Sequence, residues 1–261
     1  MPFPESQREI YSRNPLKEVI CQLRFPTILQ VTAESPAKFQ DRIRQNYPYY
    51  TEEKPEPNLP KGIGDILAGL SLPKGLQTPL HKFLTDERTR AITLNQEFLA
   101  VSEAKYRRWQ DFKAEINAAE IAFRELYKPS FYTRIGLRYK NFIDRKELGF
   151  ADKSWGVLLN KSLIGPLGVN ELSPEIRETR AQCLMSLAEV PNSFVRIIHG
   201  VAQEDSSTYL VDADFFIEEK ENLDESLRIL DEFNKLAARF FHWATTDTLR
   251  QALGPIQESV A

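Results

Sequence analysis

The chain has 261 residues, of which 42% are hydrophobic, 11% aromatic and 27% charged. This composition is typical of folded soluble domains and excludes a chain that is disordered throughout. The formal net charge of −3 argues against a dedicated nucleic-acid binder, which usually carries a basic surplus that neutralises phosphates. The N-terminus lacks the pattern of a signal peptide, and no apolar stretch approaches the ~20 residues that cross a bilayer. We therefore expect a cytoplasmic protein with no membrane partner.

The first two predicted elements are a strand and a helix. Apolar and polar residues alternate over 17–25, which predicts a strand with one well-buried face. That face comprises Val19, Cys21 and Leu23. A helix is predicted over 35–47, where Ser35 is in the N-cap position and Pro36 in the first helical position. Its buried stripe recurs every four residues and comprises Phe39, Ile43 and Tyr47.

Residues 48–87 are rich in proline and glycine, which predicts a long irregular segment. A loop of this length in a compact domain is usually functional or a mobile excursion. A short helix that docks on the body is possible within it, through Ile63, Ile66, Leu67 and Leu70. A hairpin follows, with strands over 89–94 and 98–105 joined by a tight turn.

The clearest helical pattern covers 107–127, where apolar residues step by three and four and Lys128-Pro129 ends the helix. A strand over 131–143 comes next and alternates between two faces. One face is apolar and comprises Phe131, Thr133, Ile135, Leu137, Tyr139 and Ile143. The other face is polar and comprises Tyr132, Arg134, Arg138 and Lys140.

The remaining chain predicts a short helix over 155–163, a loop over 165–168, three strands and a long helix over 223–243. The three strands cover 179–190, 194–201 and 208–217, and the first of them would also suit a helix. Thr246 is a candidate N-cap of a last short helix that ends before Gly254-Pro255.

Together these elements predict one α+β domain over 1–261, with a mostly antiparallel sheet and helices packed on one side. Residues 14–143 follow the strand-helix-strand-strand-helix-strand order of a ferredoxin-like unit. Residues 144–261 follow with three strands and a helix. We find no linker that separates the two parts.

Catalytic and metal-binding patterns are absent from the sequence. His81, His199 and His242 are far apart and belong to no metal-binding motif, so no metal or cofactor is predicted. Cys21 and Cys183 lie in apolar strand-like segments, which indicates buried free thiols. No nucleophile elbow and no phosphate-binding loop occurs.

Two polar features remain as candidate binding residues. Asp212 and Asp214 are two apart in a predicted strand, so both carboxylates project from one face, where a divalent metal is one possible ligand. The row Tyr132, Arg134, Arg138 and Lys140 suits phosphates or carboxylates through the arginines and a stacked base through the tyrosine. The competing interpretation is that the basic row pairs with Asp212 and Asp214 across the sheet. That pairing would account for both features without a ligand.

Three segments resemble a sporadically distributed family of bacterial proteins of unknown function. They are 14–19 (Asn-Pro-Leu-Lys-Glu-Val) with Arg24-Phe25, 132–141 (Tyr-Thr-Arg-Ile-Gly-Leu-Arg-Tyr-Lys-Asn), and 242–254 with its Thr-Asp-x-Leu-Arg. These segments span nearly the whole chain, which implies a single domain. The resemblance brings no established activity or catalytic residue. The patchy distribution of the family implies a mobile or defence-associated genetic setting.

The sequence therefore favours a non-catalytic binding or regulatory protein that acts through contacts with another protein, as an accessory of a bacterial defence or toxin-type system. The alternative is an RNA-binding or RNA-processing protein that uses the basic face around Arg134 and Arg138. A third interpretation is a small-ligand binder in which 48–87 covers a cavity.

Overall fold

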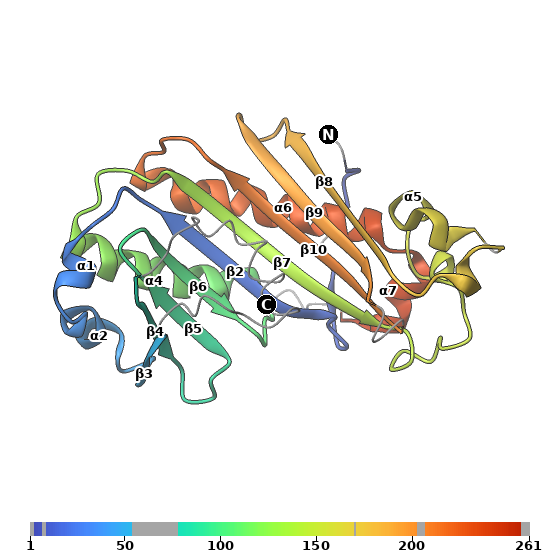
Figure 1. The fold of residues 1–261 in the computed structure, drawn as a ribbon, viewed down its shortest axis with the longest axis horizontal. Coiled ribbons are helices and arrows are strands. Elements are labelled where there is room, and N and C mark those ends of the chain that lie inside the picture. Colours follow the sequence, from blue (N-terminus) through green and yellow to red (C-terminus); the bar gives the residue numbers. More distant parts are fainter. Residues whose placement is uncertain (1–2, 7–8, 54–77, 170, 203–206, 257–261) are drawn as a thin grey trace.

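The computed structural model of the chain describes residues 3–6, 9–53, 78–169, 171–202 and 207–256 (Figure 1). The strands in these residues are β1 (Ile10–Tyr11), β2 (Leu16–Arg24), β3 (Tyr49–Glu53), β4 (Leu80–Leu84), β5 (Arg90–Leu94), β6 (Phe98–Glu103), β7 (Arg134–Asp144), β8 (Thr179–Leu187), β9 (Ser193–Val201), β10 (Thr208–Ile217) and β11 (Pro255–Ile256). The α-helices are α1 (Gln30–Ala33), α2 (Ala37–Ile43), α4 (Trp109–Tyr127), α5 (Lys161–Ile164), α6 (Ser226–Ala244) and α7 (Asp247–Leu253).

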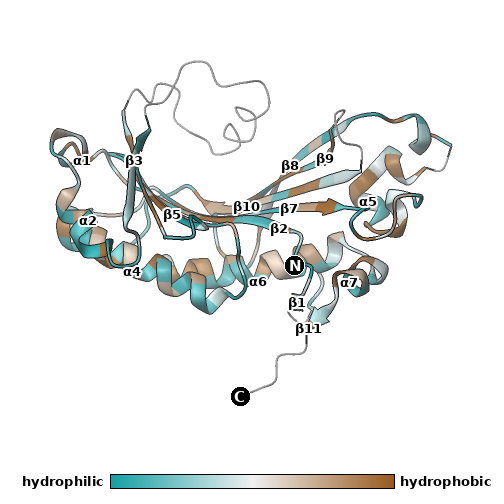
Figure 2. Ribbon diagram, turned by 90° about the horizontal axis from the view of Figure 1, so that it is seen from below, coloured by the Kyte–Doolittle hydropathy of each residue, from teal (hydrophilic) through white to brown (hydrophobic). Residues whose placement is uncertain are grey.

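A nine-stranded sheet forms the centre of the fold, in the order β3-β4-β5-β6-β2-β7-β10-β9-β8. All eight neighbouring pairs are antiparallel. The long helices α4 and α6 lie along one face of this sheet (Figure 2). The short strands β1 and β11 pair separately with each other. The predicted α+β class and the large antiparallel sheet are confirmed.

The hydrophobic core lies between the sheet and the two long helices. The apolar faces of β2 and β7 meet in register, with Cys21 opposite Leu137 and Leu23 opposite Ile135. Phe112 and Phe123 of α4 are fully buried against this layer, as are other large side chains of the predicted stripes. The period of two in the strands and the steps of three and four in the helices therefore place the core side chains as expected.

Residues 48–87 differ from the expected irregular segment, because they contain β3 and β4. Pro48 and Pro79 stand immediately before these two strands, where a missing N–H costs no ladder hydrogen bond. Every residue of β3 is exposed, so this strand has no alternating pattern that sequence could show. The expected short helix through Ile63, Ile66, Leu67 and Leu70 lies outside the described residues.

The expected helix boundaries differ at two places. The helix expected over 35–47 is the shorter α2, and Pro36, which makes no side-chain capping bond, is in its N-cap position. The helix expected over 155–163 is broken into a 3-10 turn, Trp155–Val157, and α5, because the Asn160 side chain caps a new start by accepting from Ser162 N. The predicted Thr246 cap is confirmed, since its hydroxyl accepts from the N–H of Leu249.

Two further expectations concern cysteines and the membrane. Cys21 is buried as expected, whereas Cys183 is exposed, because β8 is the outermost strand of the sheet. None of the helices in the described residues is long and apolar enough to cross a membrane.

Candidate functional site

The predicted basic row lies on the sheet face opposite α6. Arg134, Arg138 and Lys140 alternate along β7 with Tyr139, whose hydroxyl donates to Asn234 of α6. The antiparallel register with β10 places Asp212 opposite Lys140 and Asp214 opposite Arg138. The structure therefore brings five of the six predicted site residues together on one surface, which we call the polar face.

The arginines of the polar face are engaged by the two aspartates. Arg134 Nη2 lies 2.9 and 2.8 Å from the two carboxylate oxygens of Asp214. Arg138 donates to Asp212 through Nε at 2.7 Å and through Nη2 at 2.5 Å. All four side chains are at most 6% exposed. The cross-strand pairing that competed with a ligand site is what the structure contains.

Lys140 extends this network toward β2, because its Nζ lies 2.8 Å from Glu18. Gln22 of β2 accepts from Arg134 Nη1 at 3.0 Å. The ring of Phe216 lies under two guanidinium groups, those of Arg134 at 4.9 Å and Arg196 at 5.3 Å. The described contacts thus join strands β2, β7, β10 and β9 through one layer of polar side chains.

The pKa shifts on the polar face follow from its burial. Burial raises the pKa of Asp214, and the neighbouring Arg134 and Arg138 oppose that shift. Burial lowers the pKa of Arg138, but its hydrogen bonds and charge contact with Asp212 raise it overall. The net effect therefore favours the charged form of Arg138.

Tyr132 does not belong to the polar face, which corrects its predicted place in the row. Its hydroxyl donates at 2.8 Å to Glu120 of α4, on the helix side of the sheet, and the side chain is fully buried. The chain bends at Thr133, before β7 begins, so the alternation of the strand does not extend back to Tyr132. Burial raises the pKa of this hydroxyl.

Arg24 is a polar-face residue that the sequence reasoning missed. Its Nε and Nη2 atoms are buried and have no hydrogen-bond partner among the described residues. Burial and the nearby Arg134 lower its pKa. The alternation of β2 places Arg24 opposite the Val19 face, but only the pairing of β2 with β7 brings it opposite Arg134.

A hollow of about 190 Å³ adjoins the polar face where β7, β10, β9 and β8 lie side by side. Its lining includes Arg138, Lys140 and Asp212 together with Arg180 and His199. His199 Nδ1 lies 2.8 Å from the hydroxyl of Tyr209, and burial lowers the pKa of this histidine. His81 and His242 lie on β4 and α6, and no cluster of three metal-binding side chains occurs in the described residues.

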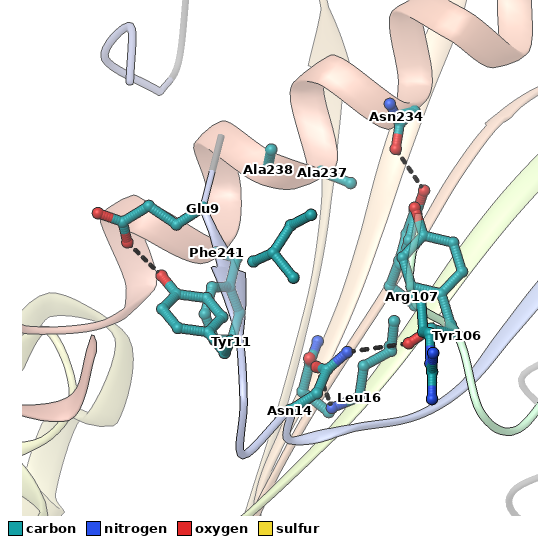
Figure 3. Close-up of a pocket in the computed structure, with 13 residues that line it drawn as sticks. Glu9, Tyr11, Asn14, Leu16, Tyr106, Arg107, Asn234, Ala237, Ala238 and Phe241 are labelled. Atoms are coloured by element: carbon teal, nitrogen blue, oxygen red, sulfur yellow. Dashed lines mark hydrogen bonds between the residues drawn. The ribbon is translucent and has the colours of Figure 1, made fainter. Parts of the chain in front are cut away.

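A second hollow lies on the opposite side of the sheet, between α6 and the segment that leads into β2 (Figure 3). Asn14 and Leu16 line it from the N-terminal side, and Tyr139 and Asn141 from β7. The sequence reasoning missed this site. Two asparagines could have indicated it: Asn141, inside strand β7, and Asn234, within the apolar stripe of α6. Asparagine is disfavoured both inside strands and inside helices.

The outer edge of β8 is the third candidate. This nine-residue strand is paired with β9 along its length, and most of its residues are exposed. Leu184, in its middle, has an exposed fraction of 54%. An edge strand of this kind offers backbone N–H and C=O groups for pairing with another chain.

Comparisons with known proteins do not assign the chain to a family. No protein-family model and no curated protein matches it. Among solved structures, it is similar to a substrate-free duplicated taurocyamine kinase from Schistosoma mansoni, with 8% identity and a TM-score of 0.33 over 92% of this chain and 33% of that one. It is also similar to a lombricine kinase, with 8% identity and a TM-score of 0.32 over 94% and 76% of the two chains. Similarities with such low identity and TM-scores do not indicate a function for this chain.

Proposed function

We propose that this chain is a non-catalytic binding protein that acts through contacts with another protein. The observation that carries the proposal is the edge strand β8, which is long and open to solvent. Natural proteins usually shorten, bend or cover such edges, because an open edge templates pairing with another chain. The setting in a bacterial defence or toxin-type system rests on the sequence resemblance alone.

The proposed partner is an extended segment of another protein that adds to the sheet as a tenth strand beside β8. Main-chain hydrogen bonds would supply affinity, and the exposed Leu184 would contact an apolar side chain of the partner. Thr179–Leu187 contains one charged residue, Arg180, so the strand carries few of the charges that discourage pairing at a sheet edge.

The test replaces Leu184 with lysine, which places a charge in the middle of the proposed contact. Because Leu184 lies opposite Arg196 of β9, circular dichroism first checks that the variant keeps its fold. The matched control is Ile121→Lys, because Ile121 is exposed to a similar extent, 48%, on helix α4. The wild type and both variants are used to capture partners from the native host, and the captured protein is then purified and titrated. We expect Leu184→Lys to weaken the affinity for the captured protein at least about tenfold, and Ile121→Lys to leave that affinity unchanged.

Equal binding by Leu184→Lys and the wild type would contradict the proposal. So would a self-associated wild type that Leu184→Lys converts to monomer, because β8 would then pair with a second copy. Light scattering on the purified chain measures this second outcome directly.

RNA binding by the polar face is not proposed. The interpretation relied on Arg134 and Arg138 as phosphate ligands, and each guanidinium makes two hydrogen bonds to an aspartate. Opening either pair would leave a buried charge without its partner, at a cost of about 3–5 kcal/mol.

We further propose that residues 14–143 form a ferredoxin-like unit on which the second part of the sheet is built. Its four strands would be β2, β5, β6 and β7, which lie side by side in the order β5-β6-β2-β7 with antiparallel neighbours. A helix follows β2 and another follows β6, as that unit requires. The pair β3-β4 would then be an addition at its outer edge.

A further inference from the structure

The pocket between α6 and β7 plays no part in the proposed protein contact. It has a volume of about 100 Å³, and the small side chains Ala237 and Ala238 of α6 leave the space for it (Figure 3). Tyr11, Tyr106 and Phe241 contribute aromatic walls. An apolar cavity of about 150 Å³ holds benzene in another protein, so this pocket suits a compact group smaller than a six-membered ring.

Two buried amides give the pocket its chemistry. Asn141 donates through Nδ2 to the carbonyl of Val211 at 3.5 Å, and its Oδ1 accepts from no described group. Asn234 accepts through Oδ1 from the hydroxyl of Tyr139 at 2.9 Å, and its Nδ2 donates to no described group. Both side chains are 7% exposed and line the pocket. Asn141 Oδ1 can therefore accept a hydrogen bond and Asn234 Nδ2 can donate one. A ligand group that both donates and accepts, such as a carboxamide or ureido group, matches this pair.

The pocket opens into a wider groove of about 780 Å³, and the two share Ile10, Tyr11, Asn14, Leu16, Tyr106 and Arg107. The groove adds Lys17, Lys105 and Arg108 to Arg107. Its one acid among the described residues, Asp111, pairs with Arg108 at 3.3 Å, and Glu9 lines the adjoining pocket. Helix α4 begins at Trp109 beside these residues, and its N-cap residue makes no side-chain capping bond. Asp111 lies in the first turn of α4 and offsets its positive end, so it is Lys17, Lys105 and Arg107 that favour an anion in the groove.

We propose that the pocket and the groove together bind one small molecule with a carboxamide or ureido head and an attached anionic group. The head would hydrogen-bond to Asn141 and Asn234, and the anionic group would lie among the basic side chains, with Arg107 at the junction. This site lies on the helix side of the sheet and does not depend on the role of β8.

The test uses N-carbamoyl-L-aspartate as the probe, because it carries a ureido head and two carboxylates. Succinate is the matched ligand without the head, and urea is the head without the anion. Calorimetric titration of the full chain should give saturable binding of the probe, with succinate and urea at least about tenfold weaker. Equal affinity for succinate, or no saturation by the probe at about 10 mM, would overturn the proposal.

Two variants locate the binding. Ala238→Leu fills the pocket with a good helix former, and Arg107→Glu reverses an exposed charge at its mouth. Each variant should lower the affinity for the probe at least about tenfold. Lys38→Glu, at an exposed position of α2 outside the groove, should leave that affinity unchanged. If Ala238→Leu does not fold, Arg107→Glu still decides. Unchanged binding by Arg107→Glu would contradict the site.

Discussion

A β-carbon on residue 136 would lie 2.1 Å from Nη1 and 2.7 Å from Cζ of Arg134. The Arg134 side chain therefore lies across Gly136 as it runs along β7 to reach Asp214, which pairs in register with Arg138. Only a residue without a β-carbon leaves room for the Arg134 side chain at this position. The Arg134–Asp214 contact therefore depends on Gly136 as well as on its two partners.

The first prediction concerns Gly136→Ala, which should displace the Arg134 guanidinium from Asp214. The two charges would stay buried with poorer geometry, so we expect the free energy of unfolding to fall by about 2–4 kcal/mol. Urea denaturation measures the change. Gly156→Ala is the control, because a β-carbon there would have no neighbour closer than 3.8 Å, and it should change stability by less than about 0.5 kcal/mol. A Gly136→Ala variant as stable as the control would show that Arg134 has another route to Asp214.

At the scale of an element, the end of α4 shows local sequence and backbone geometry in agreement. Lys128 is in the C-cap position with φ 48° and ψ 53°, in the left-handed region. Its backbone N–H donates a hydrogen bond to the carbonyl oxygen of Arg124. Pro129 follows and cannot continue the helix. The sequence predicts the end of this helix correctly, although a lysine occupies a position that glycine would adopt without strain.

The second prediction is that Lys128→Gly raises the free energy of unfolding by about 0.5–1 kcal/mol, because glycine adopts the left-handed conformation at no steric cost. Thermal and urea denaturation both measure this gain. The same residue placed at Ala118, an exposed position inside α4, should lower stability by about 1 kcal/mol. Destabilisation by both substitutions would mean that the Lys128 side chain contributes more than its backbone strain costs.

At the scale of the whole molecule, the two parts of the sequence share one sheet and one helical layer. β7 of the first part pairs along its length with β10 of the second. Asp231 of α6 accepts from the indole of Trp109 and from Lys113, both on α4, at 2.7 Å. These contacts couple residues 14–143 to 144–261.

The third prediction is that the two parts unfold together. Single-tryptophan variants that retain either Trp109 or Trp155 report on α4 and on the segment before α5, respectively. Because the shared sheet couples the two parts, we expect both fluorescence signals to change at the same urea concentration. Two separate midpoints would contradict the single domain that the sequence predicts.

The sequence by itself determined the features that repeat along contiguous residues. The alternation in β7 and β10, the stripes of α4 and α6 and the Thr246 cap all depend on spacings within one element, so they could be read before any contact was known. It also offered cross-strand pairing as one of two interpretations of the basic row.

Only the tertiary structure decided which elements meet. The pairing of Arg134 with Asp214 joins residues 80 apart, and the Asn234–Tyr139 contact joins residues 95 apart. Such contacts depend on strand order and register, which no local pattern encodes. The bend that turns Tyr132 toward Glu120, the exposed edge strand β3 and the pocket beside Asn141 arise in the same way. Their physical cause is packing between distant segments, and that packing placed the candidate sites of this protein.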